Sequence, residues 1–398
     1  MPVLDPFRGL RYDPRLVRLN EVIAPPYDVI GSAERTRLAS RNPANSVLVE
    51  LPEPDLAARL DRYEVARTLL SRWRGSGLLV ADRRPSLYPY RMTSPDGRSS
   101  IGVIGALGLA EPGTGDVLPH EETMSKPRSD RLDLLRATRT NLSPIWGLSM
   151  ATGLSATLQP EGAPQGDAFD DDGVRHQLWV MDDPDRIEAV RSSFSGAPVV
   201  IADGHHRYET ALAYRRQLKE AGDAAAAGSD AVMALVIELA EDQLTVGPIH
   251  RTIGGMGEGV DIPAAFGKWF DVIRAGPTTE RTLGALTLAE SMALVTATDA
   301  YLLLPRAEAF EAAGSDLDSS LVQLVLPELP GPEVTHRHTW DEAVAAVTEG
   351  QAQAAVFLRP VTVAQIAEWA AARRRMPPKT TYFSPKPRTG MVFRPLDD

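Results

Sequence analysis

Residues 198–207 read Pro-Val-Val-Ile-Ala-Asp-Gly-His-His-Arg, an apolar run that passes directly into a polar turn. Residues 198–202 have the character of a buried strand, and the residues after the turn follow a helical spacing, with Tyr208, Ala211 and Leu212 on one face. A strand, a tight glycine turn and a helix start together direct free backbone N–H groups towards an anion. The stretch therefore predicts an α/β fold with a phosphate-binding turn.

The side chains of this turn indicate phosphate chemistry. We assign Gly204, His205 and Arg207 to phosphate binding, because a guanidinium can fork onto phosphate oxygens and an imidazole can donate to them. Asp203 and His206 are assigned to catalysis. A carboxylate beside an anion is unfavourable unless it holds Mg²⁺ or accepts a proton from a substrate hydroxyl, and both roles of Asp203 fit phosphoryl transfer. The alternative is that Asp203 caps the helix and that the histidines pack or face solvent.

Helices and strands alternate along the rest of the chain. The apolar runs 87–92 and 101–107, joined by Ser-Pro-Asp-Gly, predict a hairpin. Helical spacing predicts a helix over 55–73, and Ser129-Asp130 predicts the start of another. We expect further helices at 183–194, 206–221, 343–347 and 363–375, and strands at 177–181, 231–239 and 354–358. The expected fold class is α/β with α+β mixed sheets.

Length and composition bound the domain organisation. A chain of 398 residues favours two or three packed units. Residues 159–173 are rich in Pro, Gly and Asp and therefore predict a loop or a boundary. We expect an N-terminal α/β segment over 1–165, a core that carries the motif over 174–275, and a C-terminal α/β segment over 276–398. Together these are expected to form one compact functional unit.

The charge balance and the missing cysteines exclude several kinds of chemistry. The chain has 42 basic and 53 acidic side chains, so its net charge of −11 disfavours nucleic acid as a partner. It has no cysteine, which removes disulfides, thiolate nucleophiles and zinc–cysteine sites. The N-terminus has no signal pattern, and no apolar run approaches the ~20 residues that span a bilayer. We therefore expect a cytoplasmic protein without a membrane partner, and the oligomeric state stays open.

A second group of charged residues lies between the hairpin and the next helix. His120, Glu121, Lys126, Arg128 and Arg131 combine an imidazole, a carboxylate and three cations in a short irregular stretch. Such a loop can bind a phosphorylated or carboxylated substrate and supply acid–base catalysis. We assign His120 and Glu121 to catalysis, and Lys126 and Arg131 to phosphate binding. The alternative is a solvated loop with surface ion pairs.

Three other stretches are candidates for the walls of the site. Ala-Pro-Pro-Tyr-Asp at 24–28 predicts a rigid wall with Tyr27 and Asp28 in a substrate pocket, although two prolines can simply shape a turn. His250, beside an arginine, predicts a second anion contact, although such a pair is weak evidence. The tail 379–390 is basic and punctuated by proline, so it could fold back over an anionic ligand.

The motif also brings a resemblance. Asp-Gly-His-His-Arg followed by Tyr and Ala resembles the motif of the ParB/sulfiredoxin-like fold, which includes the CTP-binding partition protein, sulfiredoxin and the archaeal free serine kinase. More closely, the whole chain looks like the bacterial family called domain of unknown function 1015, some of whose members carry a Spo0J/ParB-type label. The stretches that carry this second resemblance are 24–29, 119–121, 130–132, 141–145, 201–211, 249–251 and 379–383.

The resemblance implies a ParB/sulfiredoxin-like core in which the turn binds nucleotide phosphates. The free serine kinase analogy implies that Asp203 and His206 lie at the phosphoryl-transfer site, with an acidic residue elsewhere as base. Glu21, Asp28 and Glu121 all remain candidates for that base. Asn141, in a matching stretch, is assigned to the substrate pocket. Sulfiredoxin chemistry is excluded, because the cysteine that its motif needs is histidine in this chain.

These observations lead to three hypotheses. The first is a nucleotide-dependent small-molecule phosphotransferase, a serine-kinase-like enzyme that acts on a hydroxylated or amino-acid-like substrate with ATP, ADP or CTP and with Mg²⁺ held near Asp203. The second is a ParB-like nucleotide-binding regulator of DNA-associated function, which would need a basic helix-turn-helix unit that the sequence lacks. The third is a phosphate-ester hydrolase with water as the acceptor.

Overall fold

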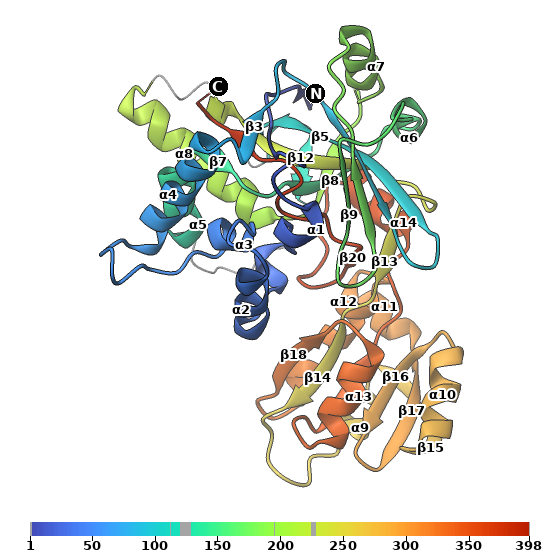
Figure 1. Cartoon of the computed structure of the whole chain (residues 1–398). Helices are drawn as coiled ribbons and strands as arrows, with labels where there is room; N and C mark the ends of the chain where they lie inside the picture. Colours follow the sequence, from blue (N-terminus) through green and yellow to red (C-terminus); the bar gives the residue numbers. More distant parts are fainter. Residues whose placement is uncertain (1, 112, 120–128, 195, 224–227, 398) are drawn as a thin grey trace. The chain divides into compact units, whose positions relative to one another are not determined.

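The chain forms two compact units (Figure 1). The structure is a computed structural model that describes residues 2–111, 113–119, 129–194, 196–223 and 228–397. Unit 1 comprises Met1–Thr245, Ala370–Arg373 and Pro385–Asp398, and unit 2 comprises Val246–Trp369 and Arg374–Ser384. Unit 1 is therefore assembled from separate parts of the chain.

A mixed sheet forms the centre of unit 1. Its described strands follow the order β6–β11–β8–β12–β5–β4–β10–β9, with β1 added beside β5. β11 runs parallel to β6, β12 runs parallel to β8, and the other pairs are antiparallel. The mixed α/β fold class is thus confirmed. The strands are β1 (Leu4–Asp5), β4 (Tyr88–Thr93), β5 (Ser99–Gly108), β6 (Val117–Pro119), β8 (Ile145–Ser149), β9 (Gly166–Phe169), β10 (Arg175–Leu178), β11 (Val199–Asp203) and β12 (Ala231–Glu238).

Two sequence predictions concern this sheet directly. The hairpin is confirmed, since β4 and β5 pair antiparallel with Thr93 opposite Ser99. Residues 159–173, the stretch rich in Pro, Gly and Asp, do not form a boundary between the two units. They contain β9, which pairs antiparallel with β10, so both strands belong to one sheet. The predicted segments also do not coincide with the two units, because the limit at 275/276 falls inside β15 (Phe270–Pro277) of unit 2.

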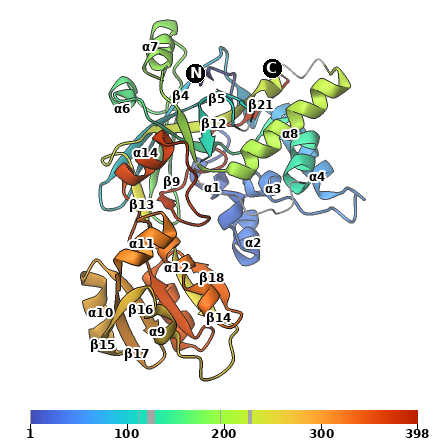
Figure 2. The same ribbon diagram turned by 180° about the vertical axis from the view of Figure 1, so that it is seen from behind.

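Helices of unit 1 cover the sheet through their apolar sides. α6 (Leu154–Thr157), α7 (Pro184–Phe194) and α8 (His205–Ala221) contribute to one buried cluster with alternate residues of β12. α5 (Ser129–Thr138) contacts both α8 and α4 (Arg62–Gly75), as the group of three helices in Figure 2 shows. α4 begins later than the expected 55–73, because Asp61 and Glu64 form a capping box that starts the helix at Arg62.

Short elements from the start and end of the chain pack around α4. Their apolar side chains form a second cluster that includes Leu10, Val22, Trp73 and Phe393. The C-terminal segment, residues 385–397, joins this layer through backbone pairs of Thr389 with Ala24 and of Phe393 with Leu10. The short elements of unit 1 outside the large sheet are β2 (Leu10–Tyr12), α1 (Leu19–Val22), η1 (Tyr27–Val29), α2 (Ser32–Arg41), α3 (Val47–Glu50), β3 (Leu79–Ala81), β7 (Thr140–Asn141), η3 (Gly228–Asp230) and β21 (Arg394–Pro395).

Unit 2 is an antiparallel sheet with an apolar core on both faces. The described strands follow the order β15–β17–β16–β19–β14–β18. Along β19, Ala354 and Val356 enter one buried cluster, whereas Ala355 and Phe357 enter another, as the two-residue period of a strand requires. The elements are β14 (His250–Gly254), α9 (Ile262–Phe266), α10 (Glu280–Leu288), β16 (Met292–Thr296), β17 (Asp299–Pro305), α11 (Ala307–Ala313), α12 (Asp318–Gln323), η4 (Leu326–Glu328), β18 (Glu333–Arg337), α13 (Trp340–Thr348) and β19 (Ala354–Phe357); α14 (Val363–Ala371), β13 (Thr245–Gly247) and β20 (Tyr382–Ser384) complete the chain.

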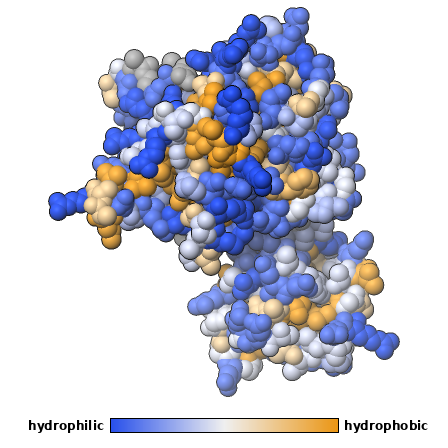
Figure 3. Space-filling model, viewed as in Figure 1, coloured by the Kyte–Doolittle hydropathy of each residue, from blue (hydrophilic) through white to orange (hydrophobic). Residues whose placement is uncertain are grey.

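No helix in the described part of the chain is both long and apolar enough to cross a membrane. The face drawn in Figure 3 is hydrophilic over much of both units, with smaller hydrophobic areas between the polar side chains. Among the residues that the structure describes, Leu56 and Leu288 are the most exposed large apolar side chains. These two residues belong to different units.

Candidate functional site

The predicted strand–turn–helix is confirmed at residues 199–221. β11 ends at Asp203, Gly204 adopts a left-handed conformation with φ of 87°, and α8 begins at His205. A Cβ atom at Gly204 would lie 3.0 Å from Nε of Arg207, so both backbone and space favour glycine there. Gly204 has no side chain to cap the helix, and the first turn of α8 contains no acidic residue. The turn therefore keeps the positive end of the helix dipole.

Arg207 turns back from α8 into the protein. Its Nη2 donates to Oδ2 of Asp203 at 3.0 Å, and its Nη1 donates to Oγ of Ser143 at 3.2 Å and to the carbonyl of Pro144. Burial lowers the pKa of Arg207, but attraction to Asp203 and then to Asp28 outweighs it and leaves the pKa above its ordinary value. The guanidinium thus stays charged and ties the turn to the start of β8.

Lys386 of the C-terminal segment lies between two carboxylates. Its Nζ is 3.2 Å from Oδ1 of Asp203 and 3.4 Å from Oδ2 of Asp28. The side chain is only 12% exposed. Burial lowers the pKa of Lys386, but the attraction to Asp203 and then to Asp28 raises this pKa by more than burial lowers it. The net pKa of Lys386 therefore lies above its usual value. The basic tail therefore brings a charged ammonium to the turn.

Tyr27 lies near two guanidinium groups. The Cζ atoms of Arg131 and Arg207 are 4.5 Å and 6.0 Å from the centre of its ring. Arg131 also donates to the carbonyl of Glu50 at 2.8 Å, and Ser143 donates to Oε1 of Glu50 at 3.1 Å. Glu50 is 3% exposed, and its burial raises the pKa of its carboxyl group against the attraction of Arg131 and Arg207. A buried carboxylate thus lies behind the turn.

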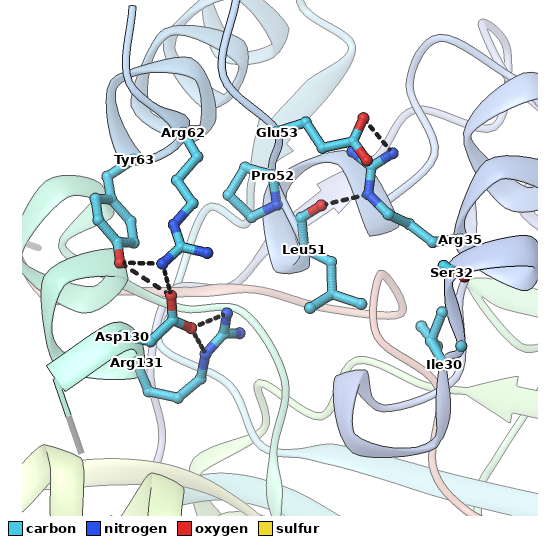
Figure 4. A pocket seen from close by; sticks show the side chains of 11 residues that line it. Ile30, Ser32, Arg35, Leu51, Pro52, Glu53, Arg62, Tyr63, Asp130 and Arg131 are labelled. Atoms are coloured by element: carbon cyan, nitrogen blue, oxygen red, sulfur yellow. Dashed lines mark hydrogen bonds and ion pairs between the residues drawn. The ribbon is translucent and has the colours of Figure 1, made fainter. Parts of the chain in front are cut away.

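A pocket of about 210 Å³ opens beside Arg131 (Figure 4). Figure 4 shows Asp130 reaching both Arg62 and Arg131, at N–O distances of 2.7 Å each. Arg35 pairs with Glu53 at 2.8 Å in the same pocket. Each of these arginines therefore has a carboxylate partner, and the charges that line the pocket nearly balance.

The structure brings several of the predicted site residues together and separates others. Asp203, Gly204, Arg207, Asp28, Tyr27 and Arg131 share the contacts described above. His205 is partly buried, whereas His206 is 44% exposed and lies 4.0 Å from Glu209. Three predicted site residues, His120, Glu121 and Lys126, lie outside the described residues.

Two predicted residues have contacts typical of structural side chains. Oδ1 of Asn141 accepts from the backbone of Met233 at 2.9 Å and from Arg394 at 3.1 Å. Glu21, a candidate base, accepts from the side chain of Asn42 at 3.0 Å. The assignments of Asn141 to the pocket and of Glu21 to catalysis stay predictions.

His250 is a buried residue of unit 2. Its Nδ1 accepts from the backbone of Leu358 at 3.2 Å, and its ring lies against Phe357 and Trp340. Burial, followed by the positive charge of Arg251, lowers the pKa of His250 to about 4. Its neutral ring therefore forms part of the core of unit 2, and its assignment to anion binding stays a prediction.

This burial predicts a pH-dependent stability. Below pH ~6.5 the unfolded chain binds a proton at His250 that the folded chain does not bind until pH ~4, so stability should fall as pH decreases through this window. The full effect is about 3 kcal/mol. In His250→Asn, whose side-chain oxygen occupies the position of Nδ1 and can still accept from Leu358, this part of the pH dependence should disappear. Urea unfolding of both proteins between pH 4 and 7 measures it; identical pH profiles would contradict the prediction.

The residues around Asp203 do not fit the predicted magnesium site as they are arranged. Lys386 stands between Asp203 and Asp28, and Arg207 holds the second oxygen of Asp203. An ion between these carboxylates would have to displace the ammonium. No group of three or more acidic or histidine side chains suited to a metal occurs in the ranges that the structure describes. Mg²⁺ at Asp203 therefore stays a prediction without structural support.

Sequence reasoning missed Glu50 and Ser143 as parts of the site. Ser143 lies in one of the stretches that carry the family resemblance, but no motif of the sequence assigns it a function. Glu50 follows the apolar residues at the end of Val47–Glu50, where no sequence pattern indicates a functional carboxylate. Lys386 belongs to the basic tail 379–390, which was expected near an anionic ligand without any residue being singled out. Its contact with Asp203 could not be read from the composition of the tail.

The fold and the turn define a mixed α/β protein with a charged strand–turn–helix site. The chain belongs to the family described as Protein of unknown function (DUF1015), whose model matches residues 4–324. The predicted family is thereby confirmed. A comparison with curated proteins found no match.

The solved structures that are similar to this chain include the following three. Free serine kinase in complex with AMP is 14% identical, covers 67% of this chain and 83% of its own, and has a TM-score of 0.35. A conserved hypothetical protein from Pyrococcus furiosus is 14% identical, with coverages of 71% and 93% and a TM-score of 0.37. SbnI with a C-terminal truncation, from Staphylococcus aureus, is 13% identical, with coverages of 74% and 87% and a TM-score of 0.39.

Proposed function

We propose that unit 1 is a nucleotide-dependent phosphotransferase that acts on a small molecule. The observation that carries this proposal is the start of α8. A left-handed Gly204 follows a buried strand, and the helix then begins without a side-chain cap or an acidic residue in its first turn. The backbone amides and the dipole at the start of a helix favour a phosphate group at such a position. ATP, ADP and CTP are the proposed nucleotides.

The charged residues around the turn supply the remaining roles. Lys386 and Arg207 are cations held beside Asp203, and they can balance the negative charge that develops on a transferred phosphoryl group. In the proposed step the acceptor hydroxyl oxygen attacks the terminal phosphorus and the bond to the bridging oxygen breaks. The hydroxyl proton passes to a carboxylate, and the shortened nucleotide leaves. Asp203 and Asp28 are the proposed acceptors of that proton among the described residues, and Glu121 remains a candidate outside them.

His206 gives a test of the phosphate site that spares the fold. His206 is assigned to catalysis, and its imidazole can also donate to a phosphate oxygen. Because its side chain is 44% exposed on the first turn of α8, His206→Ala should fold normally and weaken nucleotide binding about tenfold through the loss of this donor. Calorimetric titration with ATP, ADP and CTP, with and without Mg²⁺, measures the change. Lys219→Ala is the matched control, since Lys219 lies in the last turn of the same helix and pairs with Asp230.

The wild-type titration decides on the proposal itself. No heat with any of the three nucleotides would remove the nucleotide from the proposed function. Labelled phosphate that appears on an organic acceptor supports transfer, whereas free phosphate alone would identify a hydrolase.

A further inference from the structure

Three buried polar atoms behind the turn have no hydrogen-bond partner within the described parts of the chain. They are Oε2 of Glu50, Nε of Arg207 and Oγ1 of Thr210. Glu50 and Thr210 are 3% and 4% exposed, so bulk water does not satisfy them in this arrangement. Buried polar groups in native proteins nearly always have a partner, and exceptions of this kind point to a guest that the protein atoms themselves do not supply.

All three residues line one cavity. Its volume is about 50 Å³, and Arg131 and Ser143 also line it. A single water needs roughly 10–15 Å³, so this space admits a polar end group and is too small for a nucleotide. Glu50 can only accept a hydrogen bond when ionised, Nε of Arg207 can only donate, and the hydroxyl of Thr210 can do either. With Glu50 ionised, a guest that satisfies all three groups must therefore both donate and accept.

The charges around the cavity select the kind of guest. A carboxylate or phosphate would face the carboxylate of Glu50. An ammonium group cannot accept from Nε of Arg207, and it would lie close to the guanidinium groups of Arg207 and Arg131. A neutral hydroxyl can donate to Glu50 and accept from Arg207 at the same time. It carries no charge that either neighbour would repel.

We propose that this cavity binds the hydroxymethyl group of a small hydroxylated molecule. Glu50, Arg207 and Thr210 are its specificity-determining contacts. The proposal rests on the proposed function in one respect, namely that the hydroxylated molecule is the acceptor of the phosphoryl group. Binding in the cavity does not itself require a nucleotide.

Two compact probes of the same length test the choice of guest. Ethylene glycol ends in hydroxyl groups and ethylenediamine ends in ammonium groups. Ligand-observed NMR titrations of the full chain should give an affinity for ethylene glycol at least tenfold higher than for ethylenediamine. Equal affinities, the reverse order or no binding of ethylene glycol would overturn the proposal, the last because the cavity would then hold water alone.

Two variants test the contacts. Thr210→Val keeps the shape of the side chain and removes a hydroxyl that has no protein partner in the described chain, so the fold should be retained while ethylene glycol binding falls about threefold to tenfold. Glu50→Gln should lower it about tenfold or more, because the charge-assisted bond is lost. Thr348→Val, at an exposed position on α13, is the matched control. Unchanged binding in Thr210→Val and Glu50→Gln would contradict the assignment.

The same proteins separate this proposal from the proposed function. If ethylene glycol binds as described and the wild type binds none of ATP, ADP and CTP, the cavity proposal is supported and the phosphotransferase proposal is rejected. If a nucleotide binds and ethylene glycol does not, the cavity proposal falls and the nucleotide site stands.

Discussion

Asp203→Asn should lower the rate of phosphoryl transfer by about 10²–10⁴-fold while the protein remains folded. The carboxylate of Asp203 lies 3.0 Å from Arg207 and 3.2 Å from Lys386, so the amide would remove the charge that attracts both cations to the turn. Arg207 would keep Ser143 and Pro144 as partners, and Lys386 would keep Asp28. An amide also cannot accept the proton of the acceptor hydroxyl. Single-turnover transfer with labelled nucleotide measures the rate, and circular dichroism and the melting temperature report on the fold.

A second aspartate provides the matched control for this variant. Asp171 is also held by two cations, Arg37 at 2.7 Å and Arg41 at 2.8 Å, but it contacts neither the turn nor Lys386 in the described structure. Asp171→Asn should leave transfer within about twofold of wild type, because exposed ion pairs contribute little. Full activity in Asp203→Asn, or equal losses in both variants, would contradict a catalytic role for Asp203.

Asp170→Ala should destabilise unit 1 by about 3–5 kcal/mol. Asp170 is the common partner of two buried side chains, Arg388 and His176, and Nε2 of His176 lies 2.8 Å from its Oδ2. The chain of hydrogen bonds continues from Nδ1 of His176 to the hydroxyl of Tyr90 at 2.8 Å. The variant would leave the buried guanidinium of Arg388 with Asp172 alone, at 3.2 Å. Urea unfolding followed by circular dichroism gives the free energy.

The same carboxylate predicts a stability loss in acid. Burial raises the pKa of Asp170, but hydrogen bonds from His176 and the charge of Arg388 outweigh it, so the folded-state pKa lies well below the usual range. Its contribution to stability is full above the unfolded pKa of ~3.9 and decreases as pH falls below that value towards the folded pKa. Asp172→Ala is the control, because Asp172 is 80% exposed and should change stability by less than ~1 kcal/mol. Equal stability of wild type and Asp170→Ala would contradict the prediction that Asp170 stabilises unit 1 by compensating the buried side chains of Arg388 and His176.

Local patterns predicted the fold and the turn well, because their determinants are contiguous. The apolar run before Asp203, the left-handed Gly204 and the helical spacing after it all lie within neighbouring residues, and the β4–β5 hairpin depends on one short turn. The start of α4 was placed too early, since apolar periodicity continues through residues that precede the capping box at Asp61.

The rest of the candidate site depends on contacts between distant parts of the chain. Lys386 and Asp203 are separated by 183 positions, and no periodicity can indicate that they meet. Glu50 lies at the end of an apolar helix, and only the packed structure reveals that its carboxylate is buried beside Ser143. For His250 the sequence predicts an anion contact from a His-Arg pair, and only the structure shows that its ring lies against Phe357. Its assignment to anion binding stays a prediction.

Unit 1 is discontinuous along the chain, which has a consequence for its synthesis on the ribosome. Residues 1–245 emerge first, unit 2 follows, and Lys386 and Arg388 emerge only afterwards. Until then Asp203 and Asp170 lack cations that compensate them in the finished protein. While unit 2 is translated, the carboxylates of residues 1–245 therefore remain without some of their ion-pair partners. The charged turn obtains its full set of partners only after translation reaches the C-terminal segment.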